Sequence, residues 1–409
     1  MQIRVTVAVV LLCAGMALSD WPRYMGPNGN GTITNAKVAR QWPDGGPPTL
    51  WRVEVGAGFG GPAIAAGRVY LLDRVGEEQD KLRCFELKDG KELWSFAYDA
   101  PGKVSYPGSR STPAVDGNRV YTIGPFGHMQ CVDITTHKSL WSTNLAADHG
   151  AQRGGWAFAQ SPLVVDELVI ASIQNGRQGL VAFDKATGKV AWKSGPIGGG
   201  DTYTSPMLAT IGGVKQIVML QKGALAGVNP ADGKILWSYG GYEMRRPIPQ
   251  PVIIPDGRIF LTSGYKSGCA MVRVEKTSDG FKVAELFKDL RHGCKVAPAI
   301  LWDGHIYANC EDLGEGLTCM TVDGEVLWKT GRNPGFDLGS LLIADGLIYI
   351  MDGGRGILRL VEASPKGYRE LASAQVLGGK QIWAPMALSD GLLVLRDQSQ
   401  MKCLNVGTR

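Results

Sequence analysis

The sequence lacks the charge pattern of a nucleic-acid-binding protein and the apolar bulk of a membrane protein. Its 43 Lys and Arg against 38 Asp and Glu give a formal charge of +5, with no long basic run. We therefore expect no nucleic-acid partner. Beyond residue 19, no stretch approaches the roughly 18 uninterrupted apolar residues of a membrane-spanning helix. The mature chain is expected to have no transmembrane span.

Cysteine pairs are also absent. The chain has 8 cysteines, but no two are adjacent and none form a Cys-x-x-Cys motif, which excludes a disulfide-based scaffold. Four share one place in the repeat described below, where other copies carry Ala182 and Ala226: Cys84, Cys131, Cys319 and Cys403. We expect these to pack as small buried hydrophobes. The sequence leaves open whether Cys294 and Cys310 form a disulfide.

Motifs for common catalytic and metal sites are missing as well. The 5 histidines show no zinc-ligand spacing, and there is no Gly-x-Ser-x-Gly elbow. His137 and His305 fall in predicted turns and are expected at the surface. Residues 56–61 match Gly-x-Gly-x-x-Gly, but an apolar strand-like run follows instead of the helix a dinucleotide site needs. The acidic clusters within 77–80 and 311–315 are predicted to be solvated turns, not calcium sites.

Residues 1–19 have the pattern of a secretory signal peptide. Arg4 supplies the positive charge, residues 5–16 are apolar, and small residues precede Asp20. We expect a mature chain that begins near Asp20 in the periplasm or outside the cell. An uncleaved anchor helix is one alternative. A lipid anchor at Cys13 is another, which is disfavoured because Leu12 stands where a lipoprotein signal has a small residue.

Glycine is abundant, at 56 of 409 residues, and much of it belongs to an internal repeat. In each copy a proline opens an apolar run, a turn that is often Asp-Gly follows, and an apolar–aromatic pair comes next. Eight copies begin 43 to 51 residues apart, at Pro62, Pro113, Pro162, Pro206, Pro251, Pro298, Leu341 and Pro385.

A second phrase alternates with the first and consists of a turn, a Lys or Glu, two residues and a tryptophan. Six tryptophans hold this place: Trp51, Trp94, Trp141, Trp192, Trp237 and Trp328. Asp-Gly and Thr-Gly pairs suit two-residue hairpin turns because glycine tolerates positive φ. Each period therefore contains two hairpins, or four strands, which is typical of a propeller blade. The sequence predicts an all-β, eight-bladed β-propeller in which each tryptophan is a wedge between blades.

The two ends of the chain predict how the ring closes. The last copy ends with a third strand at 401–406, and residues 49–53 read as a fourth strand with no blade before it. Together they complete the eighth blade, because only closure removes both free edges. Proline at the start of each inner strand fits a free edge along the central channel. We expect one monomeric propeller domain over residues 48–409, preceded by a leader at 20–47.

The two phrases together resemble the pyrroloquinoline-quinone (PQQ) repeat family of eight-bladed propellers, over about residues 48 to 409. The segment Trp21–Gly31 is also similar to the leader of many exported members. That family comprises quinoprotein alcohol dehydrogenases and a non-catalytic branch of BamB-like envelope scaffolds linked to outer-membrane assembly. The resemblance implies the propeller fold and leaves open whether the protein is a dehydrogenase or a non-catalytic scaffold.

The resemblance implies further parts for an enzyme: an adjacent-cysteine disulfide against the cofactor, calcium ligands, and a catalytic aspartate on insertions between blades. This chain has no Cys-Cys, and eight repeats leave little room for insertions. We expect no catalytic residue, no metal and no cofactor, with PQQ disfavoured. The function expected is an exported, non-catalytic binding or scaffold propeller of the cell envelope. A PQQ-dependent dehydrogenase and a carbohydrate- or polymer-recognition propeller are the alternatives.

The loops from each outer strand to the next inner strand are expected to surround one mouth of the channel. They hold the candidate binding residues Arg110, Arg153, Trp156, Tyr203, Arg245, Arg246, Arg291, His292, Lys295, Lys380 and Trp383. Guanidinium groups beside aromatic faces suit a planar anion, a carboxylate-bearing peptide or a glycan. The expected partner is an envelope protein or an anionic or glycan ligand. The alternative is a merely solvated polar rim.

Overall fold

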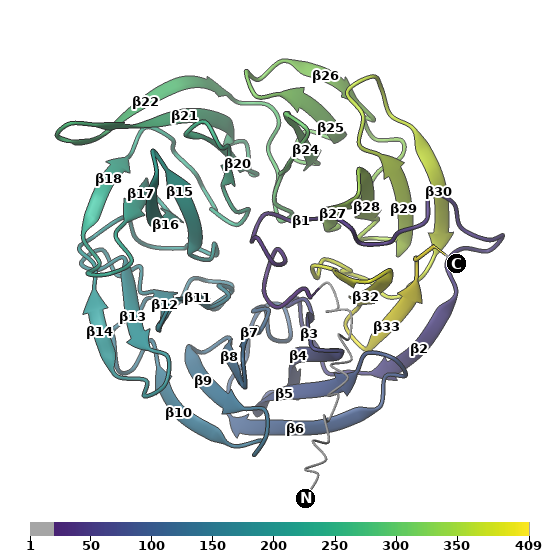
Figure 1. The fold of residues 1–409 in the computed structure, drawn as a ribbon, viewed down its shortest axis with the longest axis horizontal. Helices are drawn as coiled ribbons and strands as arrows, with labels where there is room; N and C mark the ends of the chain where they lie inside the picture. The colour runs from purple at the N-terminus through teal and green to yellow at the C-terminus, as the bar shows by residue number, and fades with distance from the viewer. Residues whose placement is uncertain (1–19, 409) are drawn as a thin grey trace, which may run out of the picture.

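The computed structural model describes residues 20–408, which form eight antiparallel blades around a central axis (Figure 1). Each blade runs from a short inner strand beside the axis to an outer strand on the perimeter. This confirms the predicted eight-bladed all-β propeller. The predicted signal peptide and Cys13 lie outside the described residues. Within 20–408, the structure has no helix with the length and apolar character needed to span a membrane.

The strands have the following bounds. The first four blades are β3 (Ala63–Ala65), β4 (Arg68–Val75), β5 (Gln79–Glu86), β6 (Glu92–Asp99); β7 (Ala114–Asp116), β8 (Arg119–Ile123), β9 (His128–Asp133), β10 (Ser139–Asn144); β11 (Leu163–Val165), β12 (Leu168–Ser172), β13 (Leu180–Asp184), β14 (Val190–Lys193); and β15 (Met207–Ile211), β16 (Val214–Gln221), β17 (Ala224–Val228), β18 (Ile235–Tyr239). The next three are β19 (Val252–Ile253), β20 (Arg258–Ser263), β21 (Gly268–Thr277), β22 (Gly280–Asp289); β23 (Ile300–Trp302), β24 (His305–Cys310), β25 (Gly316–Thr321), β26 (Val326–Lys329); and β27 (Leu341–Ala344), β28 (Leu347–Met351), β29 (Ile357–Glu362), β30 (Glu370–Gln375). The last blade combines β31 (Ala387–Ser389), β32 (Leu392–Arg396) and β33 (Gln400–Asn405) with β2 (Thr49–Glu54), and a further strand, β1 (Thr32–Ile33), belongs to the leader.

Each outer-strand tryptophan faces a small residue on the third strand of its own blade. Trp94 pairs with Cys84 and Trp141 with Cys131, in each case beside a shift in register. The equivalent partner of Trp237 is Gly227, so the prediction of Ala226 at this place was wrong by one residue. A Cβ on Gly227 would lie 2.2 Å from the Trp237 indole nitrogen, which explains why the small side chain is needed.

Most of these tryptophans also reach into the next blade, which confirms the predicted wedge. The indole N–H of Trp141 donates to the Lys185 carbonyl oxygen at 3.1 Å, and that of Trp51 donates to the Leu87 carbonyl at 2.7 Å. The Trp141 ring packs on the turn glycine of the next blade, Gly188, where a Cβ would lie 2.6 Å from the ring. One turn has His137 at φ 58° instead of glycine, and Trp94 stacks on its ring.

The ring closes as predicted. β2 pairs antiparallel with β33, so Trp51 lies opposite Cys403 and the N-terminal strand becomes the outer strand of the last blade. The core residues around this junction come from both ends of the chain, including Trp51, Leu393 and Leu404. The seven cysteines among residues 20–408 are free and buried, and the Cys294 and Cys310 sulfurs lie 3.9 Å apart.

The leader is part of the ring and crosses its centre, as the dark purple trace in Figure 1 shows. Trp21 is buried and forms a bridge with Ile64 of β3, and β1 adds a parallel fifth strand to β27. The Asp345 carboxylate accepts hydrogen bonds from the backbone N–H groups of Asn35 and Ala36. The expectation of free inner edges along the channel is therefore wrong where the leader pairs with these blades.

The two acidic clusters are not simply solvated turns. Asp80 is fully buried and lies opposite Arg74, with 2.9 Å between its Oδ1 and the guanidinium Nη1. Glu315 is also buried and accepts a hydrogen bond from the backbone N–H of His292. Burial raises the pKa of Glu311 to about 8. Hairpin register and blade packing place these carboxylates inside, so the prediction of solvated turns was wrong for them.

Candidate ligand pocket at the channel mouth

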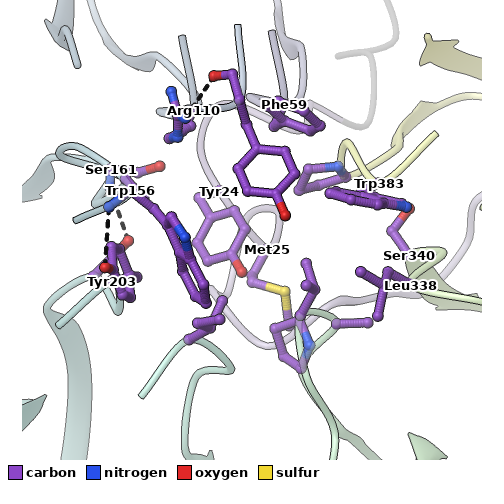
Figure 2. Close-up of a pocket in the computed structure, with 18 of the residues that line it drawn as sticks. Tyr24, Met25, Phe59, Arg110, Trp156, Ser161, Tyr203, Leu338, Ser340 and Trp383 are labelled. Carbon is purple, nitrogen blue, oxygen red and sulfur yellow. Dashed lines mark hydrogen bonds between the residues drawn. The ribbon is translucent and has the colours of Figure 1, made fainter. Parts of the chain in front are cut away.

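A pocket opens at the centre of the ring, with a volume of about 180 Å³. Figure 2 shows Trp156 and Tyr203 on one side, Phe59 and Trp383 on the opposite side, and Tyr24 and Met25 of the leader between them. The twenty lining residues are Tyr24, Met25, Phe59, Tyr106, Arg110, Trp156, Ala159, Ser161, Tyr203, Ser205, Ile248, Tyr265, Val296, Ala297, Pro298, Leu338, Ser340, Leu341, Trp383 and Pro385. Seven are aromatic and one, Arg110, is charged.

The aromatic rings form two banks joined by Tyr106. On one side Phe59 stacks on Trp383, with 5.3 Å between ring centroids. On the other, Trp156 lies 5.3 Å from Tyr203 and 5.9 Å from Tyr265. Tyr106 meets both Phe59 and Trp156 nearly edge-on, at interplanar angles of 83° and 84°. The Phe59–Trp383 pair and the two Tyr106 pairs have the stacked and T-shaped geometries that aromatic pairs prefer, whereas the two pairs on the Trp156 side are tilted.

Close packing between loops positions the Phe59 side of the pocket. The segment 56–61 connects β2 to β3 and pairs with the loop before β7, where the Phe59 N–H donates to the Ser109 carbonyl at 2.6 Å. A Cβ on Gly60 would lie 2.3 Å from the Ser111 carbonyl oxygen. The glycine-rich run therefore permits close backbone approach. It leads into strand β3 and not into the helix that a dinucleotide site requires.

A carboxylate holds the Tyr265 side of the pocket in place. Tyr265 and Lys266 both have positive φ, at 61° and 64°, which is uncommon outside glycine. The Asp312 carboxylate accepts hydrogen bonds from both of their backbone N–H groups, at 2.9 and 2.6 Å. This pairing between neighbouring blades fixes the turn that carries the Tyr265 ring to the pocket. A strained backbone held in this way is typical of binding sites.

Hydroxyl groups link four successive blades. In three blades the residue before the inner-strand proline supplies the hydroxyl: Gly61 N–H donates to Thr112 Oγ1, Thr112 N–H to Ser161 Oγ, and Ser161 N–H to Ser205 Oγ, at 2.8 to 3.1 Å. Ser161 and Ser205 are buried and line the pocket. Across residues 20–408, neither of these two hydroxyls donates a hydrogen bond to the protein, so both O–H groups remain available.

Arg110 places a positive charge in the wall of the pocket. Its two terminal nitrogens donate to the carbonyl oxygens of Gly108 and Tyr106 at 2.6 Å, and its guanidinium lies 5.8 Å from the centre of the Phe59 ring. It forms no ion pair with a carboxylate of the described chain. Desolvation lowers the pKa of Arg110 to about 10, so it stays charged at neutral pH.

The structure brings together only part of the candidate set chosen from the sequence. Arg110, Trp156, Tyr203 and Trp383 line the pocket. Arg246 lies at its edge, with its guanidinium 5.5 Å from the Trp156 ring centre and 3.3 Å from Asp201.

The other candidates lie outside the pocket lining. Arg153 packs on Phe126, Arg291 pairs with Asp289, and Lys295 lies 3.5 Å from Asp312. Arg245 and Lys380 are exposed. His292 is buried against Glu315, so its proposed place on an accessible binding face is contradicted. Arg246, Arg291 and Lys295 therefore lie beside carboxylates, whereas the other four cationic candidates form no ion pair within residues 20–408: Arg110, Arg153, Arg245 and Lys380.

Sequence reasoning missed most of the lining. Phe59 lay inside a glycine run that was considered only as a nucleotide motif, and Tyr24 and Met25 belonged to a leader without repeat signal. Ser161 and Ser205 did carry a signal, because each directly precedes a repeat proline. Tyr265 lies in a hairpin turn and not in an outer-to-inner loop, so its place in the pocket required the structure.

Eight four-stranded blades closed by the pairing of β2 with β33 define an eight-bladed β-propeller. A family model described as outer membrane protein assembly factor BamB matches residues 78–285, which is half of the chain. The chain belongs to this family.

Two curated relatives match different shares of the chain. BamB of Yersinia pestis is 23% identical over 306 residues, 71% of this chain and 72% of that protein. Lupanine 17-hydroxylase [cytochrome c] of a Pseudomonas species is 32% identical over 156 residues, 34% of this chain. The alignment spans only 21% of the hydroxylase, so that likeness is limited to a part of a longer protein.

Solved structures of a BamB protein and of a dehydrogenase have the same fold. BamB from Moraxella catarrhalis has a TM-score of 0.61 at 14% identity, covering 87% of this chain and 97% of that one. A europium-containing methanol dehydrogenase has a TM-score of 0.64 at 12% identity, covering 92% and 89%. Likeness at this level of identity supports the fold alone.

The pocket does not fit the parts that the dehydrogenase resemblance implies for PQQ and calcium. Calcium is held by carboxylate, amide and carbonyl oxygens, yet no lining side chain carries a carboxylate or an amide. Residues 20–408 contain no group of three or more His, Cys, Asp or Glu side chains arranged to hold a metal ion. The chain also lacks adjacent cysteines.

Proposed function

We propose that this chain is an exported, non-catalytic binding propeller of the cell envelope, and that the channel-mouth pocket holds part of its partner. The lining of the pocket carries this proposal: seven aromatic side chains, one guanidinium, and no carboxylate, imidazole or thiol. Tyrosine and serine can also act in acid–base and nucleophilic catalysis, but no lining side chain stands as a base beside Ser161 or Ser205, and burial raises the pKa of Tyr203 and Tyr265. Rigid aromatic walls with few polar groups are typical of a binding site.

The relationships of the chain support an envelope protein as the partner. The matching family and the Yersinia pestis relative are both named for a factor of outer-membrane protein assembly. The signal-like segment 1–19 supports export to the same compartment. A propeller ring gives such a protein a rigid scaffold, because each blade buries its faces against its neighbours.

Site-specific crosslinking in the native envelope tests the proposal. A photo-crosslinking residue replaces Tyr106 between the two aromatic banks, and the same residue replaces exposed Arg177 as the matched control. We expect a discrete crosslinked envelope component from position 106 that is lost in the Trp156→Ala/Trp383→Ala background. Labelling that is equal at both positions, or unaffected by removing both tryptophans, would contradict a role for the pocket.

Reconstitution separates this function from that of a dehydrogenase. The purified chain is incubated with PQQ and calcium, and reduction of an artificial electron acceptor is followed with alcohols or aldoses as substrates. We expect no turnover above that of free cofactor. Stoichiometric PQQ binding with substrate-dependent turnover would overturn the non-catalytic assignment.

A further inference from the structure

We propose that the channel-mouth pocket recognises a carboxylate carried on an aromatic group, either as a free acid or as the C-terminal residue of a peptide. This inference rests on the proposed binding function and specifies the chemistry of its ligand. Three features carry it: the spacing of the rings, the donor character of the polar groups, and the unpaired charge of Arg110.

The rings create a slot for a flat group. The stacked pair Phe59–Trp383 and the tilted pair Trp156–Tyr203 stand on opposite sides of the pocket, with the leader residue Met25 between them (Figure 2). Trp156 and Trp383 are both partly exposed and both line the pocket. A ring between the banks can stack on one and meet Tyr106 edge-on, the two arrangements that aromatic groups favour.

Three hydroxyl oxygens of the lining already accept a backbone N–H: those of Ser161, Ser205 and Tyr203. Arg110 is a charged donor, and the O–H groups of Ser161 and Ser205 donate to no group within residues 20–408. The lining contains no carboxylate or amide oxygen to serve as acceptor. A ligand that enters deeply is therefore favoured when it supplies acceptors, because buried donors without partners are costly.

The charge of the pocket selects among acceptors. Arg110 is partly buried and has no counter-ion in the described chain, whereas the second guanidinium, that of Arg246, lies over Trp156 at the edge and is already paired with Asp201. A carboxylate would supply the missing counter-charge in a low-dielectric site, where charge-assisted hydrogen bonds are strong. A cationic ligand would be repelled. A sugar would bring several O–H donors for which the lining side chains offer no carboxylate or amide acceptor.

A matched pair of ligands tests the charge requirement without any mutation. Binding of N-acetyl-L-phenylalanine and of its amide to the full chain is measured by isothermal titration calorimetry. We expect the acid to bind at least about tenfold more tightly, the ratio expected for one charge-assisted hydrogen bond in a buried site. Equal affinities, or no binding of the acid up to millimolar concentration, would overturn the inference.

Two arginine variants locate the effect. Arg110→Gln is expected to abolish the preference for the acid while the amide still binds, whereas Arg153→Gln is expected to leave both affinities unchanged. Arg153 is the control because it is exposed and packs on Phe126, outside the pocket lining. Arg110→Lys keeps the positive charge and should retain the preference for the acid. It serves as the second variant if Arg110→Gln fails to fold. A preference that survives Arg110→Gln would place recognition elsewhere.

Peptides distinguish the two sources of the carboxylate. A hexapeptide that ends in phenylalanine is compared with its C-terminally amidated form and with the free acid. Tighter binding of the free-carboxyl peptide than of N-acetyl-phenylalanine identifies a protein C-terminus, and the reverse order identifies a small acid. If acid and amide bind equally while crosslinking at position 106 persists, the ligand class is wrong and the binding function stands. Loss of specific crosslinking removes the binding function itself.

Discussion

Replacing Gly188 by alanine should destabilise the propeller more than the same change at Gly213. Both glycines lie in hairpin turns at nearly equal positive φ, 71° and 76°. An alanine at either place costs about 1–2 kcal/mol for the left-handed backbone, offset similarly by the unfolded chain. The environments differ, since a Cβ at Gly213 has nothing within 4 Å and one at Gly188 lies 2.6 Å from the Trp141 ring.

The additional loss of stability at Gly188 follows from its contact with the Trp141 ring, which is wedged between the two blades. To reach a normal contact of about 3.5–4.0 Å, the Trp141 ring must shift by roughly 1 Å. That shift disturbs packing against Phe183 and the hydrogen bond to the Lys185 carbonyl. Overpacking costs about 1–3 kcal/mol and a weakened hydrogen bond about 1 kcal/mol. Gly188→Ala should therefore reduce the free energy of unfolding by about 2–4 kcal/mol more than Gly213→Ala.

Urea unfolding followed by circular dichroism measures the difference. In a Trp141→Ala background, Gly188→Ala should cost no more than Gly213→Ala, because the ring that it displaces is gone. The coupling in this double-mutant cycle should match the extra cost. Equal effects of the two glycine changes in the native background, or additive effects in the cycle, would refute the wedge as an energetic link between blades.

Three further outcomes are expected. Deleting residues 401–409 removes β33, so β2 should become protease-sensitive and the melting temperature should fall; a truncated chain that melts like the parent would refute terminal closure. Burial raises the folded-state pKa of Glu311 to about 8, above the unfolded value, so its contribution to the free energy of unfolding falls as pH rises from about 4.5 to 8. Glu311→Gln should flatten this pH dependence, which urea unfolding at several pH values measures. The cysteines of residues 20–408 are buried, and burial raises the pKa of the Cys84 and Cys403 thiols to about 12, so a thiol reagent should react only after unfolding; reaction of the folded chain would contradict their packing.

The blades could be predicted because each repeats the same local physics. Hairpin glycines, a proline at the inner strand and a tryptophan on the outer strand recur at equivalent positions. The strand assignment in one copy is therefore supported by the same pattern in the others. The error at Ala226 shows the limit: the register shift before Trp237 places Gly227 opposite the indole, and a one-residue shift of this kind leaves no mark in composition. A one-residue error of this kind leaves the predicted fold class correct, but it assigns the wrong side chain to the contact with the tryptophan.

The pocket was less predictable because its parts do not repeat. Phe59, Tyr106 and Tyr265 come from three connections of different length and from different positions within their blades. Their convergence depends on ring closure and on close loop contacts such as that of Asp312 with the Tyr265 turn. The buried pair Arg74–Asp80 did have a signal, because a hairpin centred near residue 77 places the two directly opposite each other. Reading cross-strand register would have placed Asp80 inside.

The leader links the fold to the proposed function. Without it the inner strands would surround an open channel, and the rings at its mouth would have no floor. Trp21 fixes the leader to β3, β1 fixes it to β27, and the short turn between them presents Tyr24 and Met25 to the pocket. If the pocket binds as proposed, ligand affinity and leader docking should be coupled, because a ligand that contacts the floor binds only the docked form. The segment outside the repeat thus supplies the floor of the channel-mouth pocket.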